Sequence, residues 1–381
     1  MPTQPPTPPQ RLLIVTTELG VGGAERCVVN LACGLDSTRW NVQVVALASP
    51  PRPPKDALVR QLEAAGVPLM FLNCQSKWQL LSAVRKLRNI VQTESPDAVL
   101  SFLFHANIVA TLATRGLAVP QLQSLRVIEQ GGWRRRLQAR AAAKADRVLC
   151  VSEGVRRFAE ETLLLPAEQL VVIPNGIDVD SIIPVDYSPP IDRKHRLIAI
   201  GRLDPQKGFD WLIDQVAQTP MFQQSSADAW ELVIVGEGSQ KAELAGKIQK
   251  HGLDAQICLA GWQPDISCWL RDSDIYVLSS RWEGMPNTLL EAMAHGLPVV
   301  ATNVEGVSEL LSTAELRQQV LPPDQEALRL TLWPMMEDAD QRRALGKANR
   351  RQIEQHFSLR HMLQLYETTL ADTIASCRTP R

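Results

Sequence analysis

The stretch RLLIVTTELGVGGAERCVVNLACGL, residues 11–35, contains the pattern from which the fold can be predicted. Residues 11–17 form an apolar run rich in β-branched side chains, which is typical of a buried strand. The run stops at a loop with three glycines, Gly20, Gly22 and Gly23, and apolar residues then recur at helical spacing. A strand, a glycine-rich loop and a helix in this order predict the start of a βαβ unit.

The same alternation of apolar runs and helical patterns continues to the far end of the chain. Later candidate strands are NVQVVALA (41–48), VPLMFL (67–72), DAVLSFL (97–103), RVLCVS (147–152), LVVIP (170–174), RLIAIG (196–201), WELVIVG (230–236), QICLAG (256–261), DIYVLSS (274–280) and PVVAT (298–302). Such nearly continuous apolar strands indicate parallel sheets that are covered on both faces.

One segment interrupts the alternation. NGIDVDSIIPVDYSPPIDRKH, residues 175–195, contains three prolines and several turn residues without periodicity, so we interpret it as an interdomain linker. The predicted class is α/β, with two doubly wound domains at 11–185 and 186–357. A last amphipathic helix is predicted at about 358–376. Ligands are then expected in a cleft between the carboxyl ends of the two sheets.

Length and composition narrow the classes of protein. The chain has 381 residues, enough for two domains that each bury a core. Its 40 basic and 41 acidic residues argue against a general nucleic-acid binder, which is usually basic overall. The first ten residues, MPTQPPTPPQ, lack an apolar centre and predict a disordered tail rather than a signal peptide. We therefore predict a cytoplasmic protein, and the spacing of the seven cysteines indicates no metal site.

Two glycine-containing loops follow strands and suit phosphate groups. In ELGVGGAER (18–26), Gly22 and Gly23 would leave room for a ligand beside the N-terminus of a helix, where N–H groups attract anions. A tight turn without function would have a similar sequence. In GRLDPQKGFD (201–210), Arg202 and Lys207 could clamp a diphosphate from the end of a strand. The alternative there is a solvated turn with incidental charges.

The most informative motif is RWEGMPNTLLEAMAHGLPVVAT, residues 281–302. Its first acid, Glu283, lies in a loop after a strand, and Glu291 lies within the following helix. The backbone N–H groups of Asn287, Thr288 and Leu289, in the first turn of that helix, would offer an anion site. Carboxylates accept hydrogen bonds from sugar hydroxyls, so this unit could hold a diphosphate and a sugar together. A plain structural role for Glu291, stabilisation of the helix dipole, is the alternative.

Four motifs in a fixed order resemble one known family. GGAER (22–26), GRLDPQKGFD (201–210), VGEGSQ (235–240) and EGMPNTLLE (283–291) together resemble the family-4 retaining glycosyltransferases, glycosyl transferases group 1, from about residue 11 to the C-terminus. The E-x7-E element formed by the two glutamates of the last motif is the most specific part. This resemblance implies the GT-B fold, two facing Rossmann-like domains, with a UDP-, GDP- or ADP-sugar as donor and no required metal or other cofactor. It also implies that the last helix, at about 358–376, returns to the first domain.

The resemblance also implies roles for individual residues. Arg202 and Lys207 would contact the donor diphosphate, Glu283 the hydroxyls of the donor sugar, and Glu291 the ribose hydroxyls. His105, in FLFHAN, matches a position near the reacting sugar. The residues expected to bind the donor are Gly22, Gly23, Arg202, Lys207, Glu283, Asn287, Thr288, Leu289 and Glu291, and those expected in catalysis are His105, Arg202, Lys207 and Glu283.

Other positions are less informative. Glu309 in GVSEL matches the family's usual GxPE stretch, but Ser308 stands in place of the proline. DVD (178–180) and DSD (272–274) resemble a DxD metal motif, and we interpret both as structural. A sugar-nucleotide epimerase of the same fold is the alternative function.

A basic stretch in the first half raises the question of a membrane. Seven basic residues against two acids, Glu129 and Asp146, lie between positions 126 and 147: Arg126, Arg134, Arg135, Arg136, Arg140, Lys144 and Arg147. A basic amphipathic helix from Arg134 to Arg147 would bind an anionic leaflet. The family often uses lipid-linked acceptors, so the predicted partners are a nucleotide sugar, a glycan or lipid-linked acceptor and the cytoplasmic face of the inner membrane, with no nucleic acid. An ordinary solvated helix face is an equal alternative.

Overall fold

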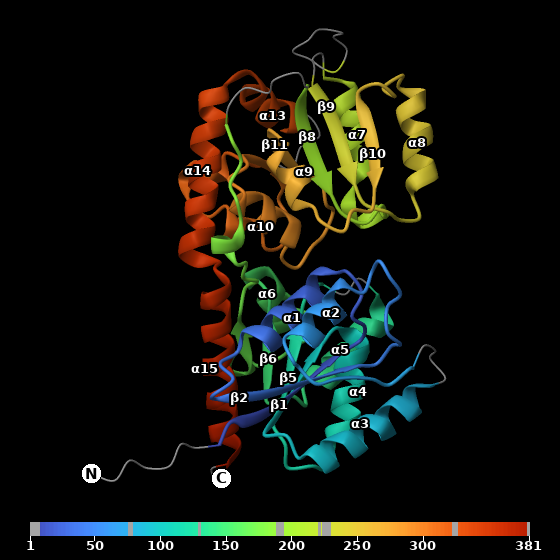
Figure 1. Cartoon of the computed structure of the whole chain (residues 1–381), viewed down its shortest axis with the longest axis vertical. Coiled ribbons are helices and arrows are strands. Elements are labelled where there is room, and N and C mark those ends of the chain that lie inside the picture. The colour runs from blue at the N-terminus through green and yellow to red at the C-terminus, as the bar shows by residue number, and fades with distance from the viewer. Residues whose placement is uncertain are drawn as a thin grey trace, which may run out of the picture. The chain divides into compact units, whose positions relative to one another are not determined.

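The computed structural model describes residues 8–74, 79–128, 131–187, 194–219, 222, 230–321 and 327–378 (Figure 1). Most of the proline-rich N-terminal stretch, residues 1–7, lies outside the described residues. The chain divides into two compact units. Unit 1 comprises Met1–Gly176 and Leu359–Arg381, and unit 2 comprises Ile177–Ser358.

Unit 1 is built on a parallel sheet of seven strands in the order β3-β2-β1-β4-β5-β6-β7. Its strands are β1 (Gln10–Thr16), β2 (Trp40–Ala46), β3 (Leu69–Phe71), β4 (Ala98–Phe102), β5 (Gln121–Leu125), β6 (Arg147–Cys150) and β7 (Leu170–Val172). Its helices are α1 (Gly23–Gly34), α2 (Ala57–Ala64), α3 (Leu80–Glu94), α4 (Phe104–Thr114), α5 (Gly132–Ala142), α6 (Glu153–Glu161), the short η2 (Ala167–Gln169) and α15 (Leu359–Arg378).

Strand β1 shows why both faces of this sheet are covered. Leu12 and Ile14 pack into a core with α1, α2 and α15, while Leu13 and Val15 pack on the opposite face against α3 and α4. Successive side chains of a strand point to opposite faces, so a strand between two helical layers must be apolar throughout.

Helix α15 belongs to unit 1 although it is the last element of the chain. Its residues Met362, Tyr366, Leu370 and Ile374 recur every four positions and are all buried in the core of unit 1. That spacing places them on one face of the helix.

Unit 2 has a parallel sheet of six strands in the order β10-β9-β8-β11-β12-β13. Its strands are β8 (His195–Ile200), β9 (Trp230–Val235), β10 (Ile257–Gly261), β11 (Ile275–Leu278), β12 (Val299–Thr302) and β13 (Val320–Leu321). Its helices are η3 (Val179–Ser181), η4 (Pro205–Lys207), α7 (Phe209–Ala217), α8 (Lys241–Lys250), α9 (Ser267–Arg271), α10 (Asn287–Ala294), α11 (Val307–Leu310), α12 (Ala314–Arg317), α13 (Ala327–Glu337) and α14 (Ala339–His356). The predicted two-domain α/β class with parallel sheets is confirmed.

The first part of the expected linker packs against unit 2. The N–H of Val185 donates to the carbonyl of His295 at 2.8 Å, and the Tyr187 hydroxyl donates to the carbonyl of Gly296 at 2.6 Å. Arg350 of α14 donates to the carbonyl of Ile182 at 3.2 Å. These contacts explain why unit 2 begins at Ile177, nine residues before position 186, where the second domain was predicted to begin.

Strand β5 is absent from the strands predicted by apolar pattern, and its composition explains the omission. Gln121, Gln123 and Ser124 are all buried there. The amide of Gln123 donates to the Thr111 hydroxyl at 2.7 Å and to the carbonyl of Ala141 at 3.1 Å. These bonds satisfy a polar side chain inside the protein, so the strand does not need an apolar sequence.

Candidate active site

The strongest candidate site of unit 2 lies between β8 and β11, where the order in which the chain adds strands to the sheet reverses. The chain proceeds outward from β8 through β9 to β10, and from β11 through β12 to β13, while β8 and β11 pair directly. The loops that follow β8 and β11 therefore leave neighbouring strands at the carboxyl edge of the sheet. Ligands bind at such switch points in doubly wound sheets.

These two loops are held in close contact. The N–H of Arg281 donates to the carbonyl of Gln206 at 2.7 Å, and the Ser279 hydroxyl donates to the carbonyl of Lys207 at 2.7 Å. Gly208 has a φ of +65°, and a Cβ at this position would clash with the carbonyl of Ser279. A glycine is required here by both the backbone angle and the approach of the second loop.

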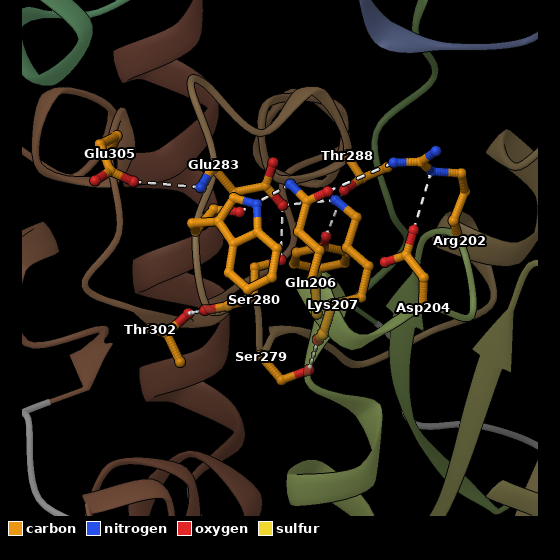
Figure 2. A network of polar contacts seen from close by, with 12 residues as sticks. Arg202, Asp204, Gln206, Lys207, Ser279, Ser280, Glu283, Thr288, Thr302 and Glu305 are labelled. Atoms are coloured by element: carbon orange, nitrogen blue, oxygen red, sulfur yellow. Dashed lines mark hydrogen bonds and ion pairs between the residues drawn. The ribbon is translucent and has the colours of Figure 1, made fainter. Parts of the chain in front are cut away.

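Lys207 and Glu283 form an ion pair at the centre of the site (Figure 2). The Nζ of Lys207 lies 2.6 Å from Oε1 of Glu283, and the hydroxyl of Ser280 donates to the same oxygen at 2.7 Å. The two charged side chains are only 15% and 9% exposed. Both predicted residues thus meet in a region shielded from water, where charge interactions are stronger than at the surface.

A second set of contacts, from β12 and the loop after it, holds the Glu283 loop in place. The Thr302 hydroxyl donates to the carbonyl of Ser280 at 2.6 Å. The backbone N–H of Glu283 donates to the carboxylate of Glu305 at 3.3 Å. Both partners come from β12 and the residues just after it, so three loops of unit 2 determine where the Glu283 carboxylate lies (Figure 2).

Arg202 is arranged differently from Lys207. Its side chain is 75% exposed, and its guanidinium lies 3.4 Å from the carboxylate of Asp204. The contact with Gln206 is long, at 3.5 Å. Figure 2 shows Arg202 and Asp204 to one side of the Lys207–Glu283 pair. An exposed side chain held by one loose ion pair can change its conformation at small cost.

Helix α10 begins at Asn287, as predicted, and carries the second acid of the motif. Glu291 is 8% exposed. The hydroxyls of Tyr276 and Thr288 are hydrogen bonded at 2.7 Å. Burial raises the pKa of Tyr276, the hydrogen bond between Tyr276 and Thr288 opposes the rise, and the charges of Glu283 and Glu291 add to it. Both acids are therefore close enough to act electrostatically on one phenol.

Of the three N–H groups predicted to form an anion site at the start of α10, that of Leu289 has a partner within the chain. The N–H of Leu289 donates to the carbonyl of Pro286 at 3.1 Å. Leu289 is also fully buried, with an exposed fraction of 0%. Its N–H is thus used in a tight turn of the helix start, and it is not available for a diphosphate in this conformation.

In unit 1, the glycine-rich loop and His105 lie at the corresponding switch point. The loop follows β1, His105 follows β4 in the first turn of α4, and β1 pairs with β4. His105 is exposed, and its ring meets the Phe104 ring edge-on, with 5.2 Å between centroids.

Gly22 was predicted to leave room for a ligand, and in this conformation a side chain of the same helix lies beside it. Gly22 precedes α1 in an extended conformation, and a Cβ there would clash with the carboxylate of Glu25. The space above this glycine is filled by an acidic side chain of the same helix, which is 8% exposed. No Cβ contact within 4 Å is found at Gly20, so the open part of the loop lies there.

The predicted basic helix is shorter than expected. Helix α5 ends at Ala142, and Arg147 is the first residue of β6. Lys144 lies in the turn between them. A helix running from Arg134 to Arg147 is therefore wrong, because Lys144 and Arg147 both lie beyond the end of α5. The exposed residues of α5 include Trp133, Arg135, Arg136, Leu137 and Arg140.

Neither acidic look-alike forms a metal site within the described residues. Asp274 accepts from the backbone N–H of Arg196 at 2.8 Å and lies 3.3 Å from His195. No group of three or more His, Cys, Asp or Glu side chains in the described ranges could hold a metal ion. In the same ranges, no helix has both the length and the apolarity needed to cross a bilayer.

Several residues of this site were missed by the sequence analysis. Ser280, Thr302 and Glu305 support Glu283, and Asp204 and Gln206 contact Arg202. Asp204 and Gln206 stand inside the GRLDPQKGFD motif, and Thr302 is the last residue of the 281–302 motif. Ser280 and Glu305 lie outside both motifs.

Two family models match the chain, and together they span most of it. The model for Glycosyltransferase Family 4 matches residues 21–181, and the model for Glycosyl transferases group 1 matches residues 194–338.

Curated relatives are glycosyltransferases. A UDP-Gal:alpha-D-GlcNAc-diphosphoundecaprenol alpha-1,3-galactosyltransferase of Escherichia coli is 25% identical over 297 residues, which are 71% of this chain and 74% of the relative. The lipopolysaccharide core biosynthesis glycosyltransferase LpsE of Rhizobium meliloti is 25% identical over 355 residues, 92% of this chain and 96% of the relative.

Solved structures show the same fold. Anabaena HepE in complex with UDP aligns with a TM-score of 0.79 at 22% identity, covering 95% of this chain and 100% of that one. With the matching family models and relatives, this likeness identifies the chain as a glycosyltransferase enzyme that belongs to the group 1, family 4 glycosyltransferases.

Proposed function

We propose that the enzyme moves a sugar, with retention of anomeric configuration, from a nucleotide-diphosphate sugar to a hydroxyl of a glycan or lipid-linked acceptor. The route served would be the synthesis of a cell-surface polysaccharide or glycolipid. The observation that carries this proposal is the shielded Lys207–Glu283 pair at the switch point of unit 2. It offers a cation for a diphosphate and a carboxylate for sugar hydroxyls in one place.

In the proposed mechanism, charge grows on the leaving diphosphate while the bond to the anomeric carbon breaks. Lys207, Arg202 and the start of α10 at Asn287 and Thr288 stabilise this charge. The acceptor hydroxyl attacks from the side on which the diphosphate leaves, and a phosphate oxygen takes the hydroxyl proton. Glu283 orients the sugar, and Glu291 binds the ribose hydroxyls. In unit 1, Gly22 and Gly23 would serve diphosphate binding after the Glu25 side chain, which lies over Gly22, turns away. His105 would serve the reacting sugar.

The names of similar proteins support the substrate classes. HepE was solved with UDP-glucose, the Escherichia coli relative is named for UDP-Gal and a diphosphoundecaprenol acceptor, and LpsE is named for lipopolysaccharide core biosynthesis. The Escherichia coli and Rhizobium meliloti relatives are named as transferases, which does not favour the epimerase alternative. We propose a UDP-sugar as the first donor class to test, with no metal or further cofactor required.

A thermal-shift panel of UDP-, GDP-, ADP- and dTDP-sugars tests the donor proposal. A ligand at one hundred times its dissociation constant should stabilise the fold by about 2.7 kcal/mol. We expect a rise in Tm with one base class, a loss of that rise in Glu291→Ala, and its retention in the control Glu315→Ala. Glu315 is an exposed acid in α12 of the same unit. No shift with any of the four classes would contradict the proposal.

We also propose that the enzyme is cytoplasmic and that the exposed face of α5 binds the anionic inner leaflet. Trp133 and Leu137 are 59% and 38% exposed and lie one turn apart, beside the exposed Arg136 and Arg140. Sedimentation with vesicles rich in phosphatidylglycerol should be strong at low salt in the wild type and weak in Arg136→Gln/Arg140→Gln. Absence of wild-type binding at low salt would refute this part.

A further inference from the structure

Arg126 occupies an unusual place in unit 1. It follows the last residue of β5, Leu125, at the carboxyl edge of the seven-stranded sheet. Its guanidinium carbon lies 5.9 Å from the centroid of the Phe102 ring, at the end of β4. Its Nη2 donates to the side-chain oxygen of Asn175, beyond the end of β7. The side chain thus lies along the edge where doubly wound sheets bind ligands.

The surroundings of this guanidinium are largely aromatic and neutral. Phe102 and Tyr366 are 0% and 1% exposed, and their ring centroids are 6.4 Å apart. Burial raises the pKa of Tyr366, and the positive charge of Arg126 acts against that rise. The cation is therefore near the phenol, and it is itself half-buried.

No acid neutralises Arg126 within the part of unit 1 that the structure describes. The arginine ion pairs found there join Arg39 to Glu367, Arg60 to Asp56, and Arg156 to Glu153 and Glu160. Glu153, the first residue of the helix that follows the neighbouring strand β6, is thus already paired with Arg156. Partial burial of a cation without a counter-charge costs free energy, which a bound anion would recover.

The start of α1 does not offer an equivalent site. The carboxylate of Glu25 already lies over Gly22 at that helix start, where it complements the helix dipole. The hydrogen-bond partner found for the Arg126 guanidinium among the described residues is the neutral side chain of Asn175.

We infer that Arg126 forms an anion-binding site on unit 1, separate from the Lys207 site, and that this site takes a phosphate group. A guanidinium presents several N–H donors in a planar fork that matches two phosphate oxygens. Asn175 holds one edge of the fork in place, and Phe102 supports its face. The inference rests on the proposed function only for which substrate carries the phosphate, the lipid-linked acceptor or the donor.

The test is a ³¹P NMR titration of the full-length enzyme with octyl phosphate, kept below its micelle concentration. Arg126→Gln should weaken binding by about tenfold or more, the effect of losing one charge-assisted hydrogen bond. The affinity of Arg126→Lys for octyl phosphate should lie between those of the wild type and Arg126→Gln, because lysine keeps the charge and lacks the planar fork of donors. Arg11→Gln, which removes one charge from the amino end of β1 in the same unit, should bind like the wild type.

Parallel titrations with UDP distinguish the source of the phosphate. If Arg126→Gln leaves UDP affinity unchanged, the site serves an acceptor phosphate, and if UDP binding weakens equally, it serves the donor. Lys207→Ala should lose UDP and keep octyl phosphate. A UDP loss in Lys207→Ala supports the donor site of unit 2 whatever Arg126 does.

Three results would overturn the inference. The first is an absence of octyl phosphate binding to the wild type. The second is an equal affinity of the wild type and Arg126→Gln for octyl phosphate. The third is a loss of octyl phosphate binding that occurs in Lys207→Ala and not in Arg126→Gln. If Arg126→Gln does not fold, the Arg126→Lys titration decides, since unchanged affinity there would contradict a role for the fork.

Discussion

The carboxylate of Glu283 receives two hydrogen bonds on one oxygen, from Lys207 and from Ser280. Among the described residues, neither of these donors reaches its second oxygen, Oε2. That oxygen can accept from a sugar hydroxyl while Oε1 stays anchored. Lys207 therefore has two tasks in the proposed mechanism, the positioning of Glu283 and the binding of the diphosphate. Recognition of sugar and diphosphate should be coupled through it.

Ser280→Ala tests the positioning of Glu283. It removes one donor from a shielded carboxylate, a contact of about 1.5 to 3 kcal/mol when a charge is involved. We expect the dissociation constant of the nucleotide sugar to rise about tenfold or more, with little change for the nucleoside diphosphate alone. Ser308→Ala is the control, because that exposed serine bonds only to Glu309 among its described contacts. Equal weakening of both ligands by Ser280→Ala would argue against a sugar-specific role.

Substitution of Gly208 tests the contact between the loops that follow β8 and β11. In Gly208→Ala, the backbone angle alone should cost about 1 to 3 kcal/mol, and the clash with Ser279 adds to it. Gly252→Ala is a matched control, with a φ of +67° but no atom within 4 Å of its Cβ. Urea unfolding should show the larger loss for Gly208→Ala, together with weaker donor binding. Equal losses in the two variants would mean that loop contact contributes nothing.

Motifs alone identified Lys207 and Glu283, but not their partnership. The two residues are 76 positions apart, and they meet because β8 and β11 are adjacent in the sheet. Strand adjacency at a switch point depends on topology, which local patterns do not encode. The role of Ser280 could not be predicted either, because a serine after a strand can have many roles and its bond to Glu283 depends on the conformation of the loop.

At the scale of elements, α7 and α8 are joined by one polar cluster. Asp214 of α7 accepts from Lys247 at 2.5 Å and lies 2.9 Å from His251, just after α8. Burial of Asp214 acts to raise its pKa, but the hydrogen bonds and charges of Lys247 and His251 outweigh it and lower the pKa. The pair of helices covers one face of the sheet that carries the site.

This shift makes a prediction about pH. A carboxyl whose pKa is lowered by folding adds stability above its unfolded pKa of about 3.9, and this stability is lost as the pH falls through the folded value. Asp214→Asn should therefore lower Tm at pH 7, and the gap to wild type should narrow from pH 5 to pH 3. Asp340→Asn, at a side chain 91% exposed, is the control and should change Tm little at any pH. A gap that widens toward pH 3 would contradict the assignment.

Elements with ordinary amphipathic or apolar patterns were predictable, and two others were not. Strand β5 was not predicted because its buried glutamines form hydrogen bonds with tertiary partners such as Thr111, so its sequence lacks an apolar pattern. Helix α5 was extended too far because Lys144 and Arg147 continue its charge pattern by coincidence. Tertiary hydrogen bonding and the position of a turn decide both cases, and neither is visible in local periodicity.

At the scale of the whole molecule, unit 1 is discontinuous in sequence. Its core is closed by α15, whose Leu370 is 0% exposed. The sequence predicted a returning last helix from the fold resemblance. The packing partners of that helix, among them Cys27 with its sulfur 3.9 Å from the Tyr366 hydroxyl, could not be read from its periodicity.

Leu370→Ala tests this arrangement. The cavity should cost about 2 to 5 kcal/mol. Hydrogen exchange should lose protection in β1 and α1, while β8 and β11 keep theirs, because Leu370 packs in the core of unit 1. Gln364→Ala, on the exposed face of the same helix, is the control. Loss of protection in β8 and β11 instead would show that α15 stabilises the other unit.

The most direct test of the central claim is calorimetric. It compares the nucleotide sugar that gives the largest thermal shift with its nucleoside diphosphate, on wild type, Lys207→Ala and Glu283→Gln. The account predicts that Lys207→Ala weakens both ligands, whereas Glu283→Gln weakens the nucleotide sugar about tenfold and leaves the nucleoside diphosphate as tight as before. If Glu283→Gln changes both ligands equally, or neither, the ion pair at the switch point of unit 2 is not the site that recognises the donor sugar.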